Sequence, residues 1–240
     1  MGVNKIIYKG YQINYYYRDD LLDLAKKIID GDILEVNSEY RNSDRAVVRS
    51  IMYNDEKLIL KESKNERKTI KKMISYFSKG EALITLINVN SFLDKNVFLY
   101  RPYVSIQKRN LGVIVKSYLI TNFISNEEAR NPEYFRNVCE TINILHKNKK
   151  SHGDAKLDNF LIDENGNVVV IDTRLRGMGF LNVRKYYDYL NIKYDIKNAD
   201  EYMRISKTPV YYFAFFVINF KKTKLFLKIR KLRKRKYNKS

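Results

Sequence analysis

One short segment of the chain concentrates side chains that could do chemistry. His152, Asp154, Lys156 and Asn159 lie within eight residues, and Asp172 follows Asn159 by thirteen residues, at the end of an apolar run. Carboxylate and amide oxygens are the hard ligands that Mg²⁺ prefers, and a lysine ammonium can neutralise phosphate oxygens. Residues of these types at this spacing could therefore position a phosphoryl group and neutralise its charge during transfer.

The segment resembles the catalytic centre of the protein-kinase-like superfamily, in which His-x-Asp is followed by an Asn and by a metal-binding Asp at the end of a hairpin. The resemblance implies that Asp154 accepts or orients the proton of the attacking hydroxyl, and that Lys156 reaches the transferring phosphoryl oxygens. It also implies ATP as the donor, with Mg²⁺ held by Asn159 and Asp172. His152 is expected to be structural, packing and hydrogen-bonding within the loop.

Two positions depart from the superfamily pattern. Gly153 stands where an arginine is usual, and Asp172-Thr173-Arg174 replaces Asp-Phe-Gly. Such departures are typical of the small-molecule and atypical kinases of the superfamily. Activation by phosphorylation acts through the missing arginine, so it is not expected in this chain.

The resemblance also implies a lysine on a strand and a glutamate on a helix in the amino half. Lys61 ends the strand-like run Leu58-Ile59-Leu60 and is expected to contact the α- and β-phosphates. Glu81 is the preferred partner of Lys61, and Glu66 is the alternative. Thr121, Asn122 and Phe123 are expected to form the hinge whose backbone meets adenine.

The glycine-rich loop of the superfamily is missing from this sequence. No glycine occurs between Ile33 and Tyr53. The turn over the phosphates is therefore expected at residues 40–45, with Ser43 and arginine side chains where glycine amides would lie.

The periodicity of hydrophobic residues, together with turn-forming residues, predicts the strands and helices that position these side chains. The expected strands are 6–8, 12–17, 33–40, 46–53, 57–62, 97–103, 111–123, 159–162 and 168–171. The expected helices are 21–29 behind Asp19-Asp20, 65–87 with an interruption at Gly80, one beginning at Asn131, and others within 183–220. This pattern predicts an α+β, protein-kinase-like bilobal fold, with a strand-rich N-lobe at 1–123, a helical C-lobe at 124–220 and a basic amphipathic tail at 221–240.

Composition and charge exclude several classes of protein. The 240 residues are 45% hydrophobic, which excludes a disordered chain, and the single cysteine excludes an internal disulfide. No secretory signal opens the sequence, and no apolar run reaches the length of a membrane span. The net charge is +19, and residues 221–240 carry eleven Lys or Arg and no acid. Subtracting these eleven leaves +8 for the other 220 residues, so the tail is expected to seek an anionic partner.

The whole layout resembles the lipopolysaccharide core heptose kinases that phosphorylate heptose II. The segments that carry this resemblance are Tyr8-Lys9-Gly10-Tyr11, Asn65-Glu66-Arg67, Ser78-Lys79-Gly80-Glu81, Gly153-Asp154, Asn159-Phe160-Leu161-Ile162, Arg184-Lys185 with Asp188, and the basic tail. The resemblance implies a lipopolysaccharide core glycolipid as acceptor and a cytoplasmic location, peripheral on the inner membrane of a Gram-negative bacterium. In the wider superfamily a helix aspartate ties down the catalytic loop, and Asp188 is the candidate here. Residues 221–240 are expected to bind the anionic membrane surface.

The same sequence is also compatible with other functions. A kinase with another acceptor, such as a Kdo sugar, an aminoglycoside or a protein, would carry the same catalytic segment. A pseudokinase would explain the missing glycine-rich loop. A nucleic-acid-binding protein would use the basic tail for phosphate contacts, but no nucleic-acid-binding motif is present. No feature specifies an oligomeric state.

Overall fold

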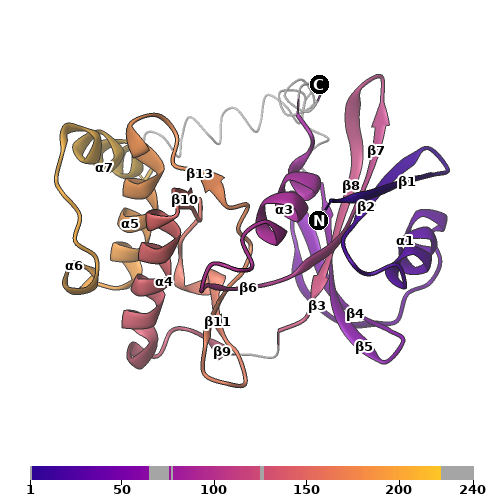
Figure 1. Cartoon of the computed structure of the whole chain (residues 1–240), viewed down its shortest axis with the longest axis horizontal. Coiled ribbons are helices and arrows are strands. Elements are labelled where there is room, and N and C mark those ends of the chain that lie inside the picture. Colours follow the sequence, from indigo (N-terminus) through magenta and orange to yellow (C-terminus); the bar gives the residue numbers. More distant parts are fainter. Residues whose placement is uncertain (1, 65–75, 77, 125–126, 223–240) are drawn as a thin grey trace. The chain divides into compact units, whose positions relative to one another are not determined.

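The computed structural model describes residues 2–64, 76, 78–124 and 127–222 (Figure 1). The chain forms two compact units: the first comprises Met1–Asn126 and Asp163–Arg174, and the second comprises Glu127–Ile162 and the chain from Leu175 onward. A strand-rich sheet and several helices give a mixed α+β structure, which confirms the expected fold class and is compatible with a bilobal kinase-like fold. The expected basic tail lies almost entirely outside the described residues.

A seven-stranded antiparallel sheet forms the centre of the first unit. Its strand order is β1-β2-β7-β8-β5-β4-β3, so the amino-terminal hairpin pairs with β7 although it precedes β3 in the chain. The strands are β1 (Asn4–Tyr8), β2 (Tyr11–Tyr15), β3 (Val36–Asn42), β4 (Ala46–Tyr53), β5 (Glu56–Ser63), β7 (Pro102–Asn110) and β8 (Val113–Asn122). Strand β5, which carries Lys61, lies inside the sheet and is held by hydrogen bonds to β4 on one side and to β8 on the other.

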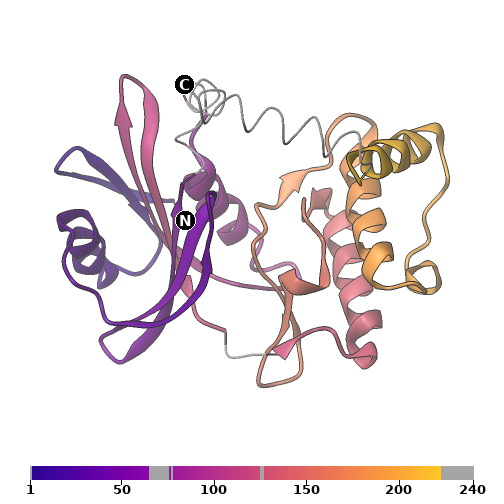
Figure 2. The ribbon, with the colours of Figure 1, turned by 180° about the vertical axis from the view of Figure 1, so that it is seen from behind.

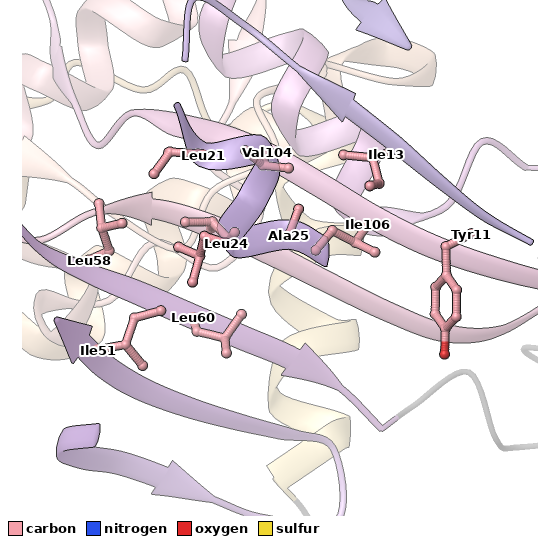
Figure 3. Packing of buried hydrophobic residues seen from close by; sticks show 11 residues of the cluster. Tyr11, Ile13, Leu21, Leu24, Ala25, Ile51, Leu58, Leu60, Val104 and Ile106 are labelled. Atoms are coloured by element: carbon pink, nitrogen blue, oxygen red, sulfur yellow. The ribbon is translucent and has the colours of Figure 1, made fainter. Parts of the chain in front are cut away.

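Helix α1 (Leu21–Asp30) covers one face of this sheet. Its buried Leu21, Leu24 and Ala25 belong to the same core cluster as Leu58 on β5 and Ile106 on β7 (Figure 3). Each fully buried aliphatic side chain stabilises the fold by roughly 1.5–3 kcal/mol relative to an exposed one. This layer therefore holds the strands in place from the side of α1.

Helix α3 (Glu81–Asn90) covers the opposite face of the sheet (Figure 1). Successive side chains of a strand point to opposite faces, so Gln107 faces away from the α1 side that Ile106 occupies. A Cβ added at Gly80, just before α3, would lie 2.6 Å from Gln107 Oε1. The sequence predicts a helix over 65–87 with an interruption at Gly80, and α3 begins directly after Gly80 and extends to Asn90. Residues 65–75 and 77 lie outside the described part of the chain.

The segment Asp163–Arg174 belongs to the first unit, although the sequence predicts it in the second lobe. Its strand β12 (Val168–Val170) pairs in parallel with β6 (Phe98–Leu99), and Tyr100 N donates to Val170 O at 3.1 Å. The dipeptide Asn165-Gly166, a strong hairpin signal between the expected strands 159–162 and 168–171, forms a turn in which Asp163 N donates to Asn167 O at 3.0 Å and Gly166 N donates to Asp163 O at 2.9 Å. These bonds bring the end of β12, and Asp172 after it, to the first unit.

Three helices form the body of the second unit: α4 (Phe135–Lys147), α5 (Val183–Asp195) and α7 (Pro209–Lys222) (Figure 2). The helix predicted to begin at Asn131 starts as a 3-10 turn, because the Asn131 side chain accepts a hydrogen bond from Glu133 N and caps residues 132–134, and α4 itself begins at Phe135. Helical spacing places Phe135, Val138, Cys139, Ile142 and Leu145 on one face, of which all but the partly buried Phe135 are buried. The remaining elements are β9 (Glu127–Glu128) paired with β11 (Phe160–Ile162), β10 (Lys150–Ser151) paired with β13 (Arg176–Gly177), η2 (Pro132–Tyr134), η3 (Leu157–Asn159), η4 (Phe180–Asn182) and α6 (Ala199–Tyr202).

Some local predictions differ from the structure. The expected strand 97–103 is divided between β6 and β7, because residues 98–99 pair with β12 while β7 pairs with β8. Asp20 makes no side-chain cap for α1, because its carboxylate pairs with Arg18. In the described residues, no helix is long and apolar enough to cross a bilayer.

Candidate functional site

A buried carboxylate anchors the loop that carries Asp154. Asp188 on α5 is 0% exposed, and it accepts hydrogen bonds from His152 N at 2.8 Å and Gly153 N at 2.9 Å. Two backbone donors, that of the buried His152 and that of Gly153, are thereby satisfied by one charged acceptor, which is a strong arrangement. The predicted tie between Asp188 and this loop is confirmed.

A second carboxylate of α5, which sequence reasoning missed, holds the same loop. Asp195 lies two turns after Asp188, and its Oδ2 accepts a hydrogen bond from Leu157 N at 3.0 Å. Residues seven apart fall on one face of a helix. The spacing of these two aspartates was the signal in the sequence that could have revealed Asp195.

Three of the predicted site residues come together in the second unit. Lys156 Nζ lies 3.0 Å from Asp154 Oδ1, and Asn159 Nδ2 donates to Asp154 O at 2.7 Å. About half of the Asp154 and Lys156 side chains is exposed, at 55% and 51%, so both groups are open to a substrate. His152 is buried, with its ring 5.3 Å from the ring of Phe160, and its Nδ1 accepts from Asp154 N. That placement agrees with the structural role expected for this histidine.

Lys61 and Asp172 come together in the first unit. The Lys61 ammonium forms an ion pair with Asp172 Oδ1. Asp172 has a φ of 49°, in the left-handed region that is uncommon for residues other than glycine and that aspartate adopts more readily than most. The backbone is therefore turned sharply where the predicted metal ligand lies.

The expected pair of Lys61 with Glu81 is not formed. Glu81 Oε1 instead lies 2.7 Å from Arg174 Nη2, and both of these side chains are about one-third exposed. The guanidinium forms a planar fork of donors that fits a carboxylate, and it takes this glutamate while Lys61 takes Asp172. The alternative partner, Glu66, lies outside the described residues.

Tyr100 lies near the charged side chains of Asp172, Glu81 and Arg174. Its hydroxyl is buried and donates to Thr173 O at 2.9 Å. Burial raises the pKa of Tyr100 well above its ordinary value, and the negative charges of Asp172 and Glu81 raise it further. The phenol thus stays neutral and serves as a fixed donor to the segment that carries Asp172.

The predicted hinge residues follow one another at the end of β8. Asn122 N donates to Arg101 O at 3.0 Å, and Asn122 Oδ1 accepts from Arg101 N at 2.6 Å. Thr121 Oγ1 donates to Asn122 O at 3.1 Å, and Lys57 Nζ lies 3.9 Å from the centre of the Phe123 ring. Contact of adenine with the backbone of Asn122 would require exchange of these bonds, so the hinge stays a prediction.

Ser43 takes the place of a glycine in the turn between β3 and β4. Its Oγ accepts from Arg45 N and Ala46 N, both at 3.3 Å. The amides that would face phosphates in a glycine-rich loop are therefore directed at a hydroxyl of the turn itself.

The donor set expected for Mg²⁺ is chemically suitable, but its two members belong to different units. Asn159 lies in the second unit and Asp172 in the first. The second oxygen of Asp172, Oδ2, makes no hydrogen bond with any described residue, which fits a role as ligand to a hard cation. Across the described residues, no group of three or more His, Cys, Asp or Glu could hold a metal by itself. The magnesium site stays a prediction.

Comparison with known proteins finds partial similarity to protein kinases. The chain is 44% identical over 46 residues to a probable serine/threonine-protein kinase KIN1 homolog of Encephalitozoon cuniculi, covering 19% of this chain and 8% of that protein. It is 36% identical over 75 residues to the KIN1 homolog of Enterocytozoon bieneusi (31% and 11%), and 36% identical over 55 residues to human NUAK family SNF1-like kinase 2 (23% and 8%). No family model matches the chain.

These similarities support the protein-kinase-like superfamily and a generic kinase function. They cover only a small part of each relative, and they do not support the finer resemblance to heptose kinases. The expected location on the inner membrane of a Gram-negative bacterium is wrong, because the similar proteins come from microsporidia and from mammals.

Proposed function

We propose that the chain is an ATP-dependent kinase that transfers the γ-phosphoryl group to an alcohol. The observation that carries this proposal is the loop held by Asp188, which presents an exposed Asp154 with Lys156 and Asn159 beside it. Phosphoryl transfer depends mainly on positioning and on charge neutralisation, and a loop anchored by buried hydrogen bonds supplies the first of these.

Each residue has a role in this proposal. Asp154 accepts or orients the proton of the acceptor hydroxyl, and Lys156 neutralises the oxygens of the transferring group. Asn159 and Asp172 would hold Mg²⁺, and Lys61 would contact the α- and β-phosphates. The bound metal would supply charge neutralisation between the phosphates.

The acceptor that the comparisons favour is a serine or threonine hydroxyl of a protein. The relatives are named as serine/threonine kinases, and their names are the only direct indication of an acceptor class. A sugar hydroxyl, such as that of a heptose or of Kdo, is the second candidate. It is favoured by Gly153 and by Asp172-Thr173-Arg174, which depart from the protein-kinase pattern toward that of small-molecule kinases.

The test is transfer of label from ATP labelled at the γ-phosphate, in the presence of Mg²⁺, to acceptors offered separately. One arm offers mixed protein substrates, and the other offers heptose- and Kdo-containing core oligosaccharides. Label on protein, at a serine or threonine located by mass spectrometry, supports the first candidate, and label on a sugar supports the second. Nucleotide binding without transfer to any acceptor or to water would favour a pseudokinase and contradict the proposal.

A further inference from the structure

We propose that Arg174 is a positioning residue, which neutralises Glu81 and so leaves Lys61 available to Asp172. This inference rests on the proposed function, because it gives the Lys61–Asp172 pair a purpose only if the first unit binds nucleotide. It assigns to Arg174 the task that the superfamily pattern would give to Lys61, namely pairing with the glutamate of the helix.

Three consecutive residues are held by side chains from separate elements of the first unit. Lys61 on β5 pairs with the Asp172 carboxylate, and the Tyr100 hydroxyl donates to Thr173 O. Two residues of α3 hold Arg174: Glu81 pairs with its guanidinium, and Asn88 Nδ2 donates to its carbonyl at 2.9 Å. Arg174 therefore fastens the segment to the first turn of α3 and to a position two turns further along that helix.

The charges explain why the arginine is needed. Asp172 and Glu81 both raise the pKa of the buried Tyr100, and Arg174 lowers it, so the three charged groups lie near one hydroxyl. Two carboxylates that share a small region repel each other unless each has its own cation. With Arg174 present, Glu81 has its own cation. Without it, Glu81 would compete with Asp172 for the Lys61 ammonium.

The test measures the affinity for Mg·ATP, and its dependence on Mg²⁺ concentration, by calorimetry. Arg174→Gln is expected to weaken binding about tenfold, because Glu81 then draws Lys61 away from Asp172. The double variant Glu81→Gln/Arg174→Gln is expected to recover to within about threefold of the parent, because the competing carboxylate is also gone. A merely structural ion pair would also be rescued in its unfolding temperature, but its loss and its rescue would leave the Mg²⁺ dependence of binding unchanged, whereas competition for Lys61 changes that dependence in Arg174→Gln and restores it in the double variant.

Three controls accompany this test. Arg174→Lys keeps the positive charge but loses the planar fork of donors, so its affinity is expected to lie between those of the parent and Arg174→Gln. Lys95→Ala removes an exposed cation of the first unit that has no ion pair among the described residues, and it should not change the affinity. Asp172→Ala should abolish the Mg²⁺ dependence of binding, and thermal unfolding of every variant shows that it is folded.

The outcomes separate this proposal from the proposed function. A parent chain that fails to bind Mg·ATP contradicts the proposed function, and the role of Arg174 with it. A parent that binds, together with an Arg174→Gln variant that binds equally well, overturns the role of Arg174 alone. A double variant that binds no better than Arg174→Gln also overturns it.

Discussion

Asp188 combines complete burial with two hydrogen bonds to the backbone of the loop before Asp154. A buried carboxylate of this kind is costly unless its oxygens are well paired, and here both oxygens accept from amides. It acts on the candidate chemistry indirectly, by fixing the backbone from which Asp154 projects.

Replacing Asp188 by asparagine should destabilise the fold. One carboxylate oxygen becomes an amide donor that faces a backbone N–H, so a buried donor loses its acceptor. We expect a loss of about 3 kcal/mol in the free energy of unfolding, measured by urea denaturation. The matched control is Asp158→Asn on the same unit, where an exposed pair with Arg130 is lost and the change should stay below about 1 kcal/mol. Equal effects of the two substitutions would show that Asp188 does not anchor the loop.

The side chains that lie near Asp154 could be predicted from the sequence, because they belong to the same short loop. The spacing of Asp154, Lys156 and Asn159 within six residues fixes their neighbourhood almost without reference to the rest of the chain. The partner of Glu81 could not be predicted in this way. It depends on a tertiary arrangement that brings Arg174 closer to this glutamate than Lys61, which no local pattern records.

At the scale of elements, α3 depends on the glycine that precedes it. Gly80 has φ 85° and ψ 152°, a conformation that is essentially restricted to glycine, and an added Cβ would lie 2.5 Å from Ile114 Cδ1. Gly31, which ends α1, has φ 81° and ψ 22° and open space around it. The two glycines therefore differ in conformation and in crowding.

Alanine substitution should distinguish these two glycines. Gly80→Ala is expected to cost about 3 kcal/mol in the free energy of unfolding, because backbone strain and steric overlap add. Gly31→Ala is expected to cost about 1 kcal/mol, because only the left-handed backbone conformation is penalised. Thermal and urea unfolding of both variants measure the difference. A Gly80→Ala variant as stable as Gly31→Ala would contradict the placement of α3 against β7 and β8.

Elements with a local signal were predicted well, and elements that rest on distant pairing were not. The hairpin at Lys9-Gly10 and the turn at Asn165-Gly166 form where glycine follows a residue suited to a turn. Strand β6 is only two residues long and pairs in parallel with β12, about seventy residues further along. A two-residue strand has no periodicity of its own, so its separation from β7 could not be foreseen.

At the scale of the whole molecule, the division into two units places the candidate residues in two groups. The first unit holds Lys61, Glu81, Asp172 and Arg174, and the second holds the loop with Asp154. The residues expected to bind phosphate and the residues expected to act on the acceptor thus belong to different compact units of the chain.

The basic tail gives a further prediction at this scale, and we propose an anionic surface as its partner. Five aromatic residues of α7 are exposed, namely Tyr212, Phe213, Phe215, Phe216 and Phe220, and residues 221–240 carry eleven cations and no acid. Aromatic side chains followed by basic residues suit the interface of an anionic bilayer. A chain cut after Phe220 is therefore expected to fold but to lose binding to vesicles that contain anionic lipid.

Co-sedimentation with these vesicles at low and high salt measures this effect. Binding of the intact chain should weaken as salt is added, because the Debye length falls to about 3 Å at 1 M. Circular dichroism verifies that the cut chain is folded. If both forms sediment equally, the tail is not the anchor, and it is then simply a solvated basic terminus.

In the proposed kinase, Asp154 acts on the acceptor hydroxyl. The most direct test compares the parent with Asp154→Asn in transfer of labelled γ-phosphoryl from ATP, with nucleotide affinity measured on the same samples. The substitution preserves the shape of the side chain but removes the carboxylate, so turnover should fall about a hundredfold or more while the affinity for Mg·ATP stays within a few-fold of the parent. Turnover of Asp154→Asn within a few-fold of the parent would contradict the account.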